Sequence, residues 1–205
     1  MKIKICGLNP TRDVQACIDL KVHFLGFVFY DKSPRNTDLR DIKVLKKFNR
    51  KSSQYVSVCV DPTDSFLQEN ILGNFEYIQL HGSETSERVK EIKNKGIKVI
   101  KAIKVKEQKD INLYKDYEDK ADLILFDSTS MEKSQSIPKD LLNKLPKGEK
   151  FGLAGAINLQ NIREYSQLGF NFLDLSSGLE RENLKGYKDH LKIKNFVNIV
   201  NELKN

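Results

Sequence analysis

Cysteine, long apolar runs and metal-binding motifs are all scarce in this sequence. Its three cysteines, Cys6, Cys17 and Cys59, lie far apart, and the chain opens on a short strand-like run rather than on the apolar stretch of an export signal. We therefore expect reduced thiols and a cytoplasmic protein. No apolar run approaches the roughly 20 residues that cross a bilayer, so we expect no membrane partner.

Patterns for metal and nucleic-acid binding are also missing. The three histidines are scattered, and neither CxxC nor HExxH occurs, so no metal site is predicted. The formal net charge is +7, but lysines alternate with Asp and Glu along the chain, and no basic stretch carries interleaved aromatic residues. This indicates a solvated lysine-rich surface, with modest steering of an anionic substrate and no nucleic-acid partner.

What the chain does contain is the composition of one globular domain, residues 1–205, with 39% hydrophobic and 31% charged residues. Short apolar runs recur at the spacing of βα units and are rich in Val, Ile, Leu and Phe without strict alternation, which is typical of buried parallel strands. The runs are 3–6, 24–29, 55–60, 77–80, 99–103, 123–126, 151–153 and 172–175.

Helical patterns occupy the intervals between these runs. They lie at 11–22, 38–48, 63–72, 83–95, 158–168 and 189–203. Asp61-Pro62 is a start signal for the third, and Gly96 a stop signal for the fourth. Strands alternating with helices, without a second-domain signal, predict an α/β fold, a single-domain (β/α)8 TIM barrel near the lower end of the usual size range. A doubly wound open sheet is the alternative.

Two reactive side chains end strands in this prediction. Cys6 closes the first run, before Gly7, and Asp127 follows the sixth. Catalytic residues of barrels lie at the carboxyl ends of strands. A thiol near a cation can ionise and act as a base or a nucleophile, and a carboxyl beside apolar walls can act as a general acid. The competing interpretations are packing for Cys6 and a loop or cap for Asp127, while Cys17 and Cys59 are interpreted as packing.

Other polar residues at strand ends are candidates for substrate binding. Arg35, in Ser-Pro-Arg, can clamp a carboxylate through its planar guanidinium, although it could also be a surface residue. His81 could hydrogen-bond a substrate or simply be a satisfied rim residue. Asp61 is interpreted as a helix cap, and Asp174 as a buried, hydrogen-bonded structural carboxylate.

Small residues follow the last two strands. Gly155 ends the seventh, and Ser176, Ser177 and Gly178 end the eighth. Barrel enzymes often bind phosphate with backbone N–H groups of these two loops. A phosphorylated small molecule is therefore the predicted substrate.

Taken in order, these residues resemble the phosphoribosylanthranilate isomerase family of tryptophan biosynthesis, and the resemblance covers nearly the whole chain. Its pieces are KICGL at 4–8, GFVF at 26–29, SPR at 33–35, VD at 60–61, IQLHG at 78–82, LFD at 125–127, LAG at 153–155, LDLSSGLE at 173–180 and KGYKD at 185–189.

The resemblance implies an aldose–ketose isomerase that converts N-(5-phosphoribosyl)anthranilate to 1-(2-carboxyphenylamino)-1-deoxyribulose 5-phosphate by an Amadori rearrangement. Asp127 would be the general acid that opens the ribose ring, and Cys6 the general base that takes the C2 proton. Arg35 would hold the anthranilate carboxylate, and the loops at Gly155 and Ser176–Gly178 the phosphate. No metal or organic cofactor is implied, and the chain would be a monomer or homodimer.

Two departures from the family pattern stand out. A Gly-rich loop followed by Phe-Asp-Trp usually comes after the acid, but residues 128–139 contain neither, and 128–136 is predicted to be a mobile loop. The turn after the seventh strand usually has two glycines. Here the second is Ala156, and a methyl group is expected to fit only if φ is negative, so weaker phosphate binding is expected.

Three alternatives remain at this point. A histidine-pathway sugar isomerase would pair two aspartates, where this chain offers Cys6. An indole-glycerol-phosphate synthase needs Lys and Glu in its site, and Lys101 has no convincing partner in the sequence. The third alternative is a barrel that binds its ligand without turnover.

Overall fold

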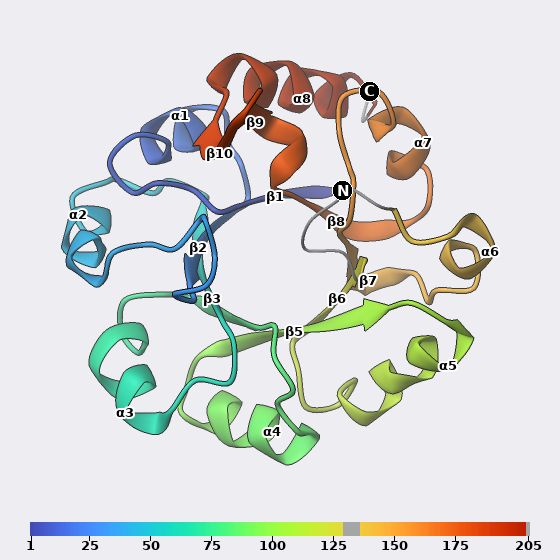
Figure 1. Cartoon of the computed structure of the whole chain (residues 1–205), viewed down its shortest axis with the longest axis horizontal. Helices are drawn as coiled ribbons and strands as arrows, with labels where there is room; N and C mark the ends of the chain where they lie inside the picture. The colour runs from blue at the N-terminus through green and yellow to red at the C-terminus, as the bar shows by residue number, and fades with distance from the viewer. Residues whose placement is uncertain (129–135, 204–205) are drawn as a thin grey trace.

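The computed structural model describes residues 1–128 and 136–203. Its parallel strands close into a barrel in which each strand pairs with the next and β8 pairs with β1 (Figure 1). The strands are β1 (Lys2–Cys6), β2 (Phe24–Phe29), β3 (Gln54–Cys59), β4 (Tyr77–Leu80), β5 (Lys98–Val105), β6 (Leu123–Ser128), β7 (Gly148–Leu153) and β8 (Phe170–Leu175). The predicted (β/α)8 barrel is confirmed, and the β1–β8 pairing excludes an open sheet. Most of the loop predicted at 128–136 lies outside the described residues.

The strand boundaries depart most from prediction in β7. This strand begins at Gly148, before the apolar run, because Glu149 and Lys150 continue its extended backbone while remaining largely outside the core. By contrast β2 and β4 are buried at every position and match their apolar runs end to end. An apolar run therefore marks only the buried part of a strand. Where a strand begins with polar residues, its first residue is set by backbone pairing with the neighbouring strand and not by the apolar run.

The predicted helical segments all contain helix, but each helix is shorter than its pattern. They are α1 (Val14–Asp19), η1 (Leu39–Asp41), α2 (Ile42–Leu45), α3 (Asp64–Phe66), η2 (Leu67–Ile71), α4 (Ser86–Asn94), α7 (Ile162–Ser166) and α8 (His190–Glu202). In the first, the Asn9 side chain accepts hydrogen bonds from the backbone N–H groups of Thr11 and Arg12, which holds this segment in a turn. Lys21, with φ of 57°, ends it.

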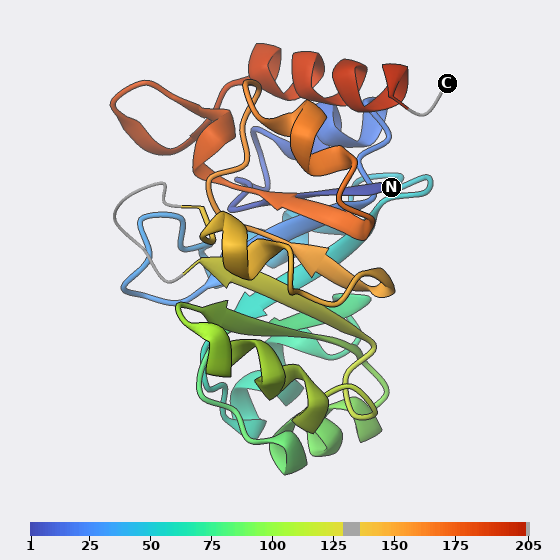
Figure 2. The same cartoon turned by 90° about the vertical axis from the view of Figure 1, so that its right-hand side faces the viewer.

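Several short elements have no counterpart in the sequence prediction. They are α5 (Gln108–Ile111), η3 (Asn112–Asp116), α6 (Lys139–Leu142), η4 (Ser177–Leu179) and the antiparallel pair β9 (Glu180–Arg181) and β10 (Leu184–Lys188). Single helical turns present too few apolar positions to make a periodic pattern. The β9–β10 hairpin extends from the end of the barrel at which the strands finish (Figure 2).

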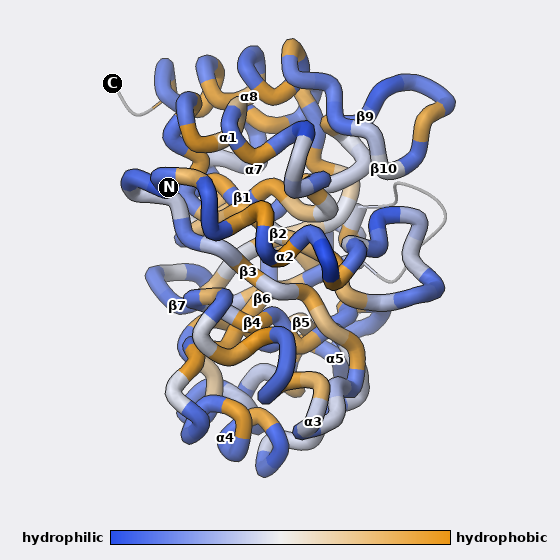
Figure 3. Tube along the Cα trace, turned by 90° about the vertical axis from the view of Figure 1, so that its left-hand side faces the viewer, coloured by the Kyte–Doolittle hydropathy of each residue, from blue (hydrophilic) through white to orange (hydrophobic). Residues whose placement is uncertain are grey.

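The core has two parts, one inside the barrel and one between the strands and helices. Inside, Phe24 meets Tyr77 and Phe172 edge to face, with ring centroids 5.3 and 5.6 Å apart. Outside, the strands carry hydrophobic residues along the trace, and α8 alternates hydrophilic and hydrophobic stretches (Figure 3). No helix within residues 1–128 and 136–203 is long and apolar enough to cross a membrane.

The inner face of the barrel can be followed along each strand by counting in twos, because alternate side chains face the same side. Leu125 and Phe172 belong to the inner cluster, and Cys6 packs against it. Asp127 follows Leu125 by two residues, and Asp174 follows Phe172 by two. Strand alternation therefore turns these three polar side chains toward the barrel interior, near the ends of β1, β6 and β8.

Candidate active site

Asp127 and His81 meet at the mouth of the barrel. Asp127 Oδ2 lies 3.4 Å from His81 Nε2, and the Asp127 side chain is 21% exposed. Its Oδ1 accepts a 2.8 Å hydrogen bond from the backbone N–H of Ser128. Burial, reinforced by the negative charge of Asp174, raises the pKa of Asp127 to about 7. A carboxyl with this pKa is partly protonated at neutral pH and can donate a proton.

The imidazole of His81 is the uncharged partner in this contact. Burial lowers the pKa of His81 to about 4, and the positive charges of Lys104, Lys4 and Lys101 act in the same direction. The amide of the buried Gln79 lies against the other ring nitrogen, with Nε2 2.9 Å from Nδ1. Gln79 therefore fixes the orientation of the ring that faces Asp127.

Cys6 is a partly exposed free thiol at the end of β1. Burial raises its pKa, and the charge of Lys4 is the largest influence in the opposite direction. The next residue, Gly7, has φ of 73°, a conformation that favours glycine. A Cβ at this position would lie 2.5 Å from Arg35 Cδ, so the glycine lets the arginine pack directly beside the thiol strand.

Arg35 reaches this position as half of an ion pair that the sequence did not predict. Its Nε and Nη2 donate to the two carboxylate oxygens of Glu180, at 2.6 and 3.0 Å. The buried Lys188 donates to the same carboxylate at 3.2 Å. Glu180 and Lys188 belong to the hairpin, which thereby ties down the side chain that was predicted to clamp a substrate carboxylate.

The loops after β7 and β8 touch one another through Gly178. A Cβ on this residue would lie 2.2 Å from the carbonyl oxygen of Ile157, so only glycine permits the approach. Ser176 Oγ donates to the carbonyl oxygen of Cys6, and Lys188 Nζ donates to that of Ser176. The predicted loops at Gly155 and Ser176–Gly178 are therefore adjacent, and the second also contacts the thiol strand.

Ala156 overturns the expectation that a methyl group fits only at negative φ. Its φ is +52°, following Gly155 at +97°. Two side-chain amides hold the turn, because Nδ2 of Asn158 and Nδ2 of Asn161 both donate to the carbonyl oxygen of Ala156, at 3.2 and 2.8 Å. These hydrogen bonds offset the roughly 1–2 kcal/mol that a left-handed conformation costs a residue with a Cβ.

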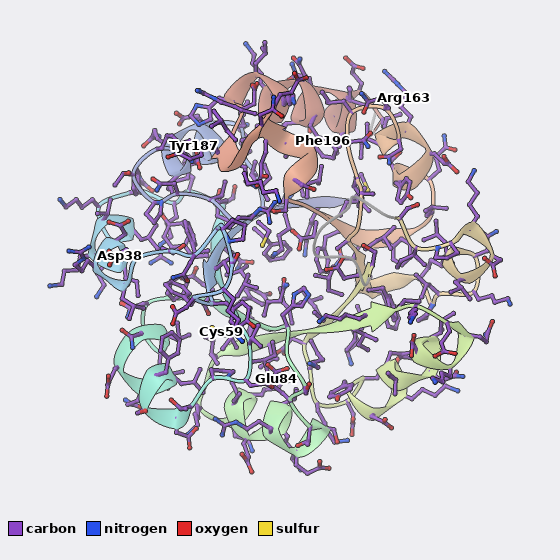
Figure 4. The ribbon with its side chains drawn as sticks, in the orientation of Figure 1. Asp38, Cys59, Glu84, Arg163, Tyr187 and Phe196 are labelled. Carbon is purple, nitrogen blue, oxygen red and sulfur yellow. The ribbon has the colours of Figure 1, made fainter. Side chains whose placement is uncertain are left out.

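Lys101 has the partner that the sequence did not reveal. Its Nζ lies 2.6 Å from Oε2 of Glu84, and both side chains are almost completely buried. Glu84 also accepts from the backbone N–H groups of Asp61 and Gly82. Figure 4 shows Glu84 on the barrel side of α4, whereas Arg163 lies at the outer rim. This network braces the loops around His81.

The helix-cap interpretation of Asp61 is wrong. Thr63 caps α3, and the Asp61 carboxylate instead accepts a hydrogen bond from the backbone N–H of Ser83.

Two cavities open at this end of the molecule. One, of about 350 Å³, includes His81, Lys101 and Lys104 in its walls, together with Tyr30 and Tyr117. The other, of about 260 Å³, lies beside Gly7, Arg35 and the hairpin residue Tyr187. Both are polar enough and large enough to receive parts of a small anionic molecule.

Lys4, Gln79, Lys104, Glu180 and Lys188 are the residues near this site that the sequence prediction missed. Two of them could have been found by counting back in twos along the strands, since Lys4 precedes Cys6 by two residues and Gln79 precedes His81 by two. Asp174 was predicted as a buried, hydrogen-bonded carboxylate, and its 2.9 Å bond from Lys4 confirms this.

Comparison with known proteins gives consistent results. Residues 3–199 match the family model described as N-(5'-phosphoribosyl)anthranilate (PRA) isomerase. The curated N-(5'-phosphoribosyl)anthranilate isomerase of Staphylococcus aureus strain Mu3 is 35% identical over 211 residues, covering 98% of this chain and 97% of the relative.

Two solved structures share the whole fold. One shows monomers generated from the dimeric phosphoribosylanthranilate isomerase of Thermotoga maritima, with a TM-score of 0.81, 25% identity, and coverage of 98% of this chain and 99% of that one. The other is a phosphoribosylanthranilate isomerase in complex with reduced 1-(o-carboxyphenylamino)-1-deoxyribulose 5-phosphate, with a TM-score of 0.82, 26% identity and the same coverage.

Proposed function

The chain belongs to the N-(5'-phosphoribosyl)anthranilate isomerase family, an enzyme family, and from that premise we propose that Asp127 and Cys6 carry the two proton transfers of the reaction. The reaction is an Amadori rearrangement, in which an aldose amine becomes a 1-amino-ketose. The observation that carries the assignment is a carboxyl with a pKa of about 7 at the same barrel mouth as a free thiol. Lys4 and Asp174 influence the pKa values of both groups.

In the first step, Asp127 donates its proton to the ribose ring oxygen. The C1–O bond breaks, and the lone pair of the anthranilate nitrogen forms a C=N bond to C1, which gives a protonated Schiff base. His81 accepts or donates a hydrogen bond at Asp127 without adding charge, because its pKa lies near 4. A general acid works best when its pKa is near the working pH, as that of Asp127 is.

In the second step, the thiolate of Cys6 takes the proton from C2. The electrons of the C2–H bond form a C1=C2 double bond, and those of the C=N bond return to nitrogen, so the product of this step is an enolamine. Reprotonation at C1 and loss of the enol proton give the ketose. The two steps need a proton donor and a proton acceptor. Asp127 supplies the first, whereas Cys6 must lose its proton to supply the second, against the burial that raises the pKa of its thiol.

Binding of the two anionic ends of the substrate is assigned to different groups at the mouth of the barrel. We assign the phosphate to the adjacent loops at Gly155 and Ser176–Gly178, whose backbone N–H groups suit an anion. The anthranilate carboxylate is assigned to Arg35. Because Glu180 engages Nε and Nη2, this contact uses the remaining nitrogen, Nη1. Ring stacking and hydrogen bonding in the larger cavity are assigned to Tyr30 and His81.

We also propose that residues 1–205 form one domain that works in the cytoplasm as a monomer or homodimer. The closed barrel and three free cysteines support the first two statements. The structural relatives include both a dimeric enzyme and monomers derived from it.

The experiment is a fluorescence assay with N-(5-phosphoribosyl)anthranilate generated in the cuvette. The anthranilate signal should fall quickly with the wild-type chain and not with Cys6→Ser or Asp127→Asn, provided that both variants keep the wild-type circular dichroism spectrum. Near wild-type turnover in either variant would show that its proposed role is wrong. A folded wild-type protein that binds the product analogue without turnover would indicate a binding-only barrel.

A further inference from the structure

Lys4 lies completely inside the barrel, two residues before Cys6 on β1. Its side chain is 0% exposed, and its Nζ donates to Asp174 Oδ2 at 2.9 Å. The pairing of β1 with β8 sets Lys4 directly opposite Asp174, so closure of the barrel creates this ion pair. Asp174 Oδ1 has no hydrogen-bond partner among the described residues, which leaves Lys4 as the donor to this carboxylate.

The neighbouring strand leaves space for the ammonium group. A Cβ built on Gly26 would lie 3.2 Å from Lys4 Nζ and 3.1 Å from the Cα of Cys6. Gly26 pairs with Cys6 in the β1–β2 register. The glycine therefore keeps open a space in which the ammonium lies beside the strand position that carries the thiol.

Four charged groups influence the pKa of the Cys6 thiol, namely Lys4, Asp174, Lys188 and Arg35. Lys188 and Arg35 both have Glu180 as a partner, as Lys4 has Asp174, so none of the three cations is unpaired. Lys4, however, is on the same strand and the same face as Cys6, two residues before it, and its charge has the largest lowering influence on the pKa of the thiol. It is the best-placed cation of the three.

We propose that Lys4 is a positioning residue for the base, supplying the positive charge that lets Cys6 ionise inside the barrel, while Asp174 holds Lys4 in place. The inference rests on the proposed role of Cys6. Lys4 stays an ammonium ion throughout. The thiol proton leaves to solvent, the S⁻ group takes the C2 proton of the substrate to form S–H, and Lys4 itself neither gains nor loses a proton.

The pKa values agree with this geometry. Burial disfavours the charged form of Lys4, but Asp174 and Cys6 together outweigh it, so the pKa of Lys4 is raised and the residue remains a cation. Burial raises the pKa of Cys6, and Lys4 is the largest opposing influence, while Asp174 adds a smaller shift upward. Removing both charges should therefore move the titration of Cys6 upward.

The test measures the pH dependence of alkylation at Cys6 with iodoacetamide, followed by peptide mass spectrometry. Only the thiolate reacts, so the rate reports ionisation directly. Cys17 and Cys59 are buried, with pKa values of about 12, and serve as internal controls. The variant is Lys4→Met/Asp174→Asn, which removes both charges. Lys2→Met is the matched control, because Lys2 is a lysine of the same strand and face that lies over the Phe24 ring.

The double variant should move the Cys6 profile upward by about one pH unit or more, which is about a tenfold slower reaction below the pKa. Lys2→Met should leave it in place. A folded double variant whose profile coincides with that of the wild type would overturn the proposal. If the double variant does not fold, Lys4→Gln/Asp174→Asn, which keeps two polar side chains that can hydrogen-bond, replaces it, and an unchanged profile overturns the proposal. So does wild-type Cys6 that reacts no faster than Cys17 and Cys59.

These outcomes separate the inference from the proposed function. Alkylation reports the charge state of Cys6 whether or not the residue acts as a base. If the profiles shift as expected but Cys6→Ser keeps its isomerase activity, the base assignment fails and the Lys4 effect stands. If Cys6→Ser is inactive and the profiles do not shift, the base assignment stands and the role of Lys4 is wrong.

Discussion

The imidazole of His81 and the carboxyl of Asp127 face each other across the end of β5, with Nε2 3.4 Å from Oδ2. Lys104, which pairs with Asp127 in the β5–β6 register, is the largest charge influence on His81 after burial. As the pH falls toward 7, Asp127 is therefore the member of this pair that takes up a proton, because its pKa is about 7, whereas His81, with a pKa of about 4, remains neutral. The acid is therefore held ready beside a neutral ring.

The first prediction concerns how the free energy of unfolding depends on pH. The pKa of Asp127 is about 7 in the folded chain and about 3.8 when unfolded, so the folded state binds more protons between these values and loses stability as pH rises through them. Asp127→Asn should therefore raise the free energy of unfolding at pH 8, on the order of 2 kcal/mol, and by much less at pH 5. Urea unfolding at both values tests this.

His81 provides the control for that measurement. Its folded pKa of about 4 lies below its ordinary value of 6.5, so the unfolded chain binds the extra proton and stability rises with pH across that window. His81→Asn should reduce the loss of stability on going from pH 7 to pH 5. Equal effects of Asp127→Asn at pH 5 and pH 8 would contradict the raised pKa.

The second prediction concerns Gln79. Its amide Nε2 lies 2.9 Å from His81 Nδ1, on the side of the ring away from the nitrogen that meets Asp127. Gln79→Met keeps the volume and removes the hydrogen bond, so kcat should fall on the order of tenfold while the protein stays folded. Its pH–rate profile should also change, because His81 becomes free to choose either tautomer. An unchanged profile with lower thermal stability would instead indicate a packing role.

The third prediction separates Arg35 from its partner. Arg35→Ala should raise KM about tenfold or more, because a charge-assisted contact to the substrate carboxylate is lost. Glu180→Gln keeps the arginine but leaves Lys188 buried with a neutral partner, so it should lower stability by about 3 kcal/mol. Steady-state kinetics and thermal unfolding of both variants are compared. An unchanged KM in Arg35→Ala would argue against the clamp.

The fourth prediction concerns the turn after β7. Ala156 has a φ of +52°, so Ala156→Gly relieves backbone strain and should stabilise the protein by about 0.5–1 kcal/mol. The asparagine amides that bind its carbonyl are retained in the variant. Urea denaturation at pH 7 measures the change, and inhibition by inorganic phosphate shows whether the turn binds the anion more tightly. A loss of stability would contradict the inferred backbone strain at Ala156.

The strand ends were predictable because their signal is local. An apolar run that stops at Cys6, His81 or Asp127 predicts both a buried strand and the residue presented at its end, and the structure places all three at that edge of the barrel. Short helices such as α5 and α6 were not predictable, since one turn carries too few apolar positions. The expectation that a methyl group at residue 156 requires a negative φ was wrong, because the side chains of Asn158 and Asn161 stabilise a turn in which Ala156 has a positive φ.

The sequence by itself determined the alternation of strands and helices, the fold class, and the candidate acid, base and phosphate loops, because each follows from hydrophobic period and from which residue ends a run. Only the tertiary structure decided which charges meet. Lys4 and Asp174 are 170 residues apart, and Arg35 and Glu180 are 145 apart. The first pair forms because closure of the barrel aligns β1 with β8, and the second because the hairpin folds over the loop after β2. Contacts of this kind depend on the register of distant strands, which no local pattern encodes.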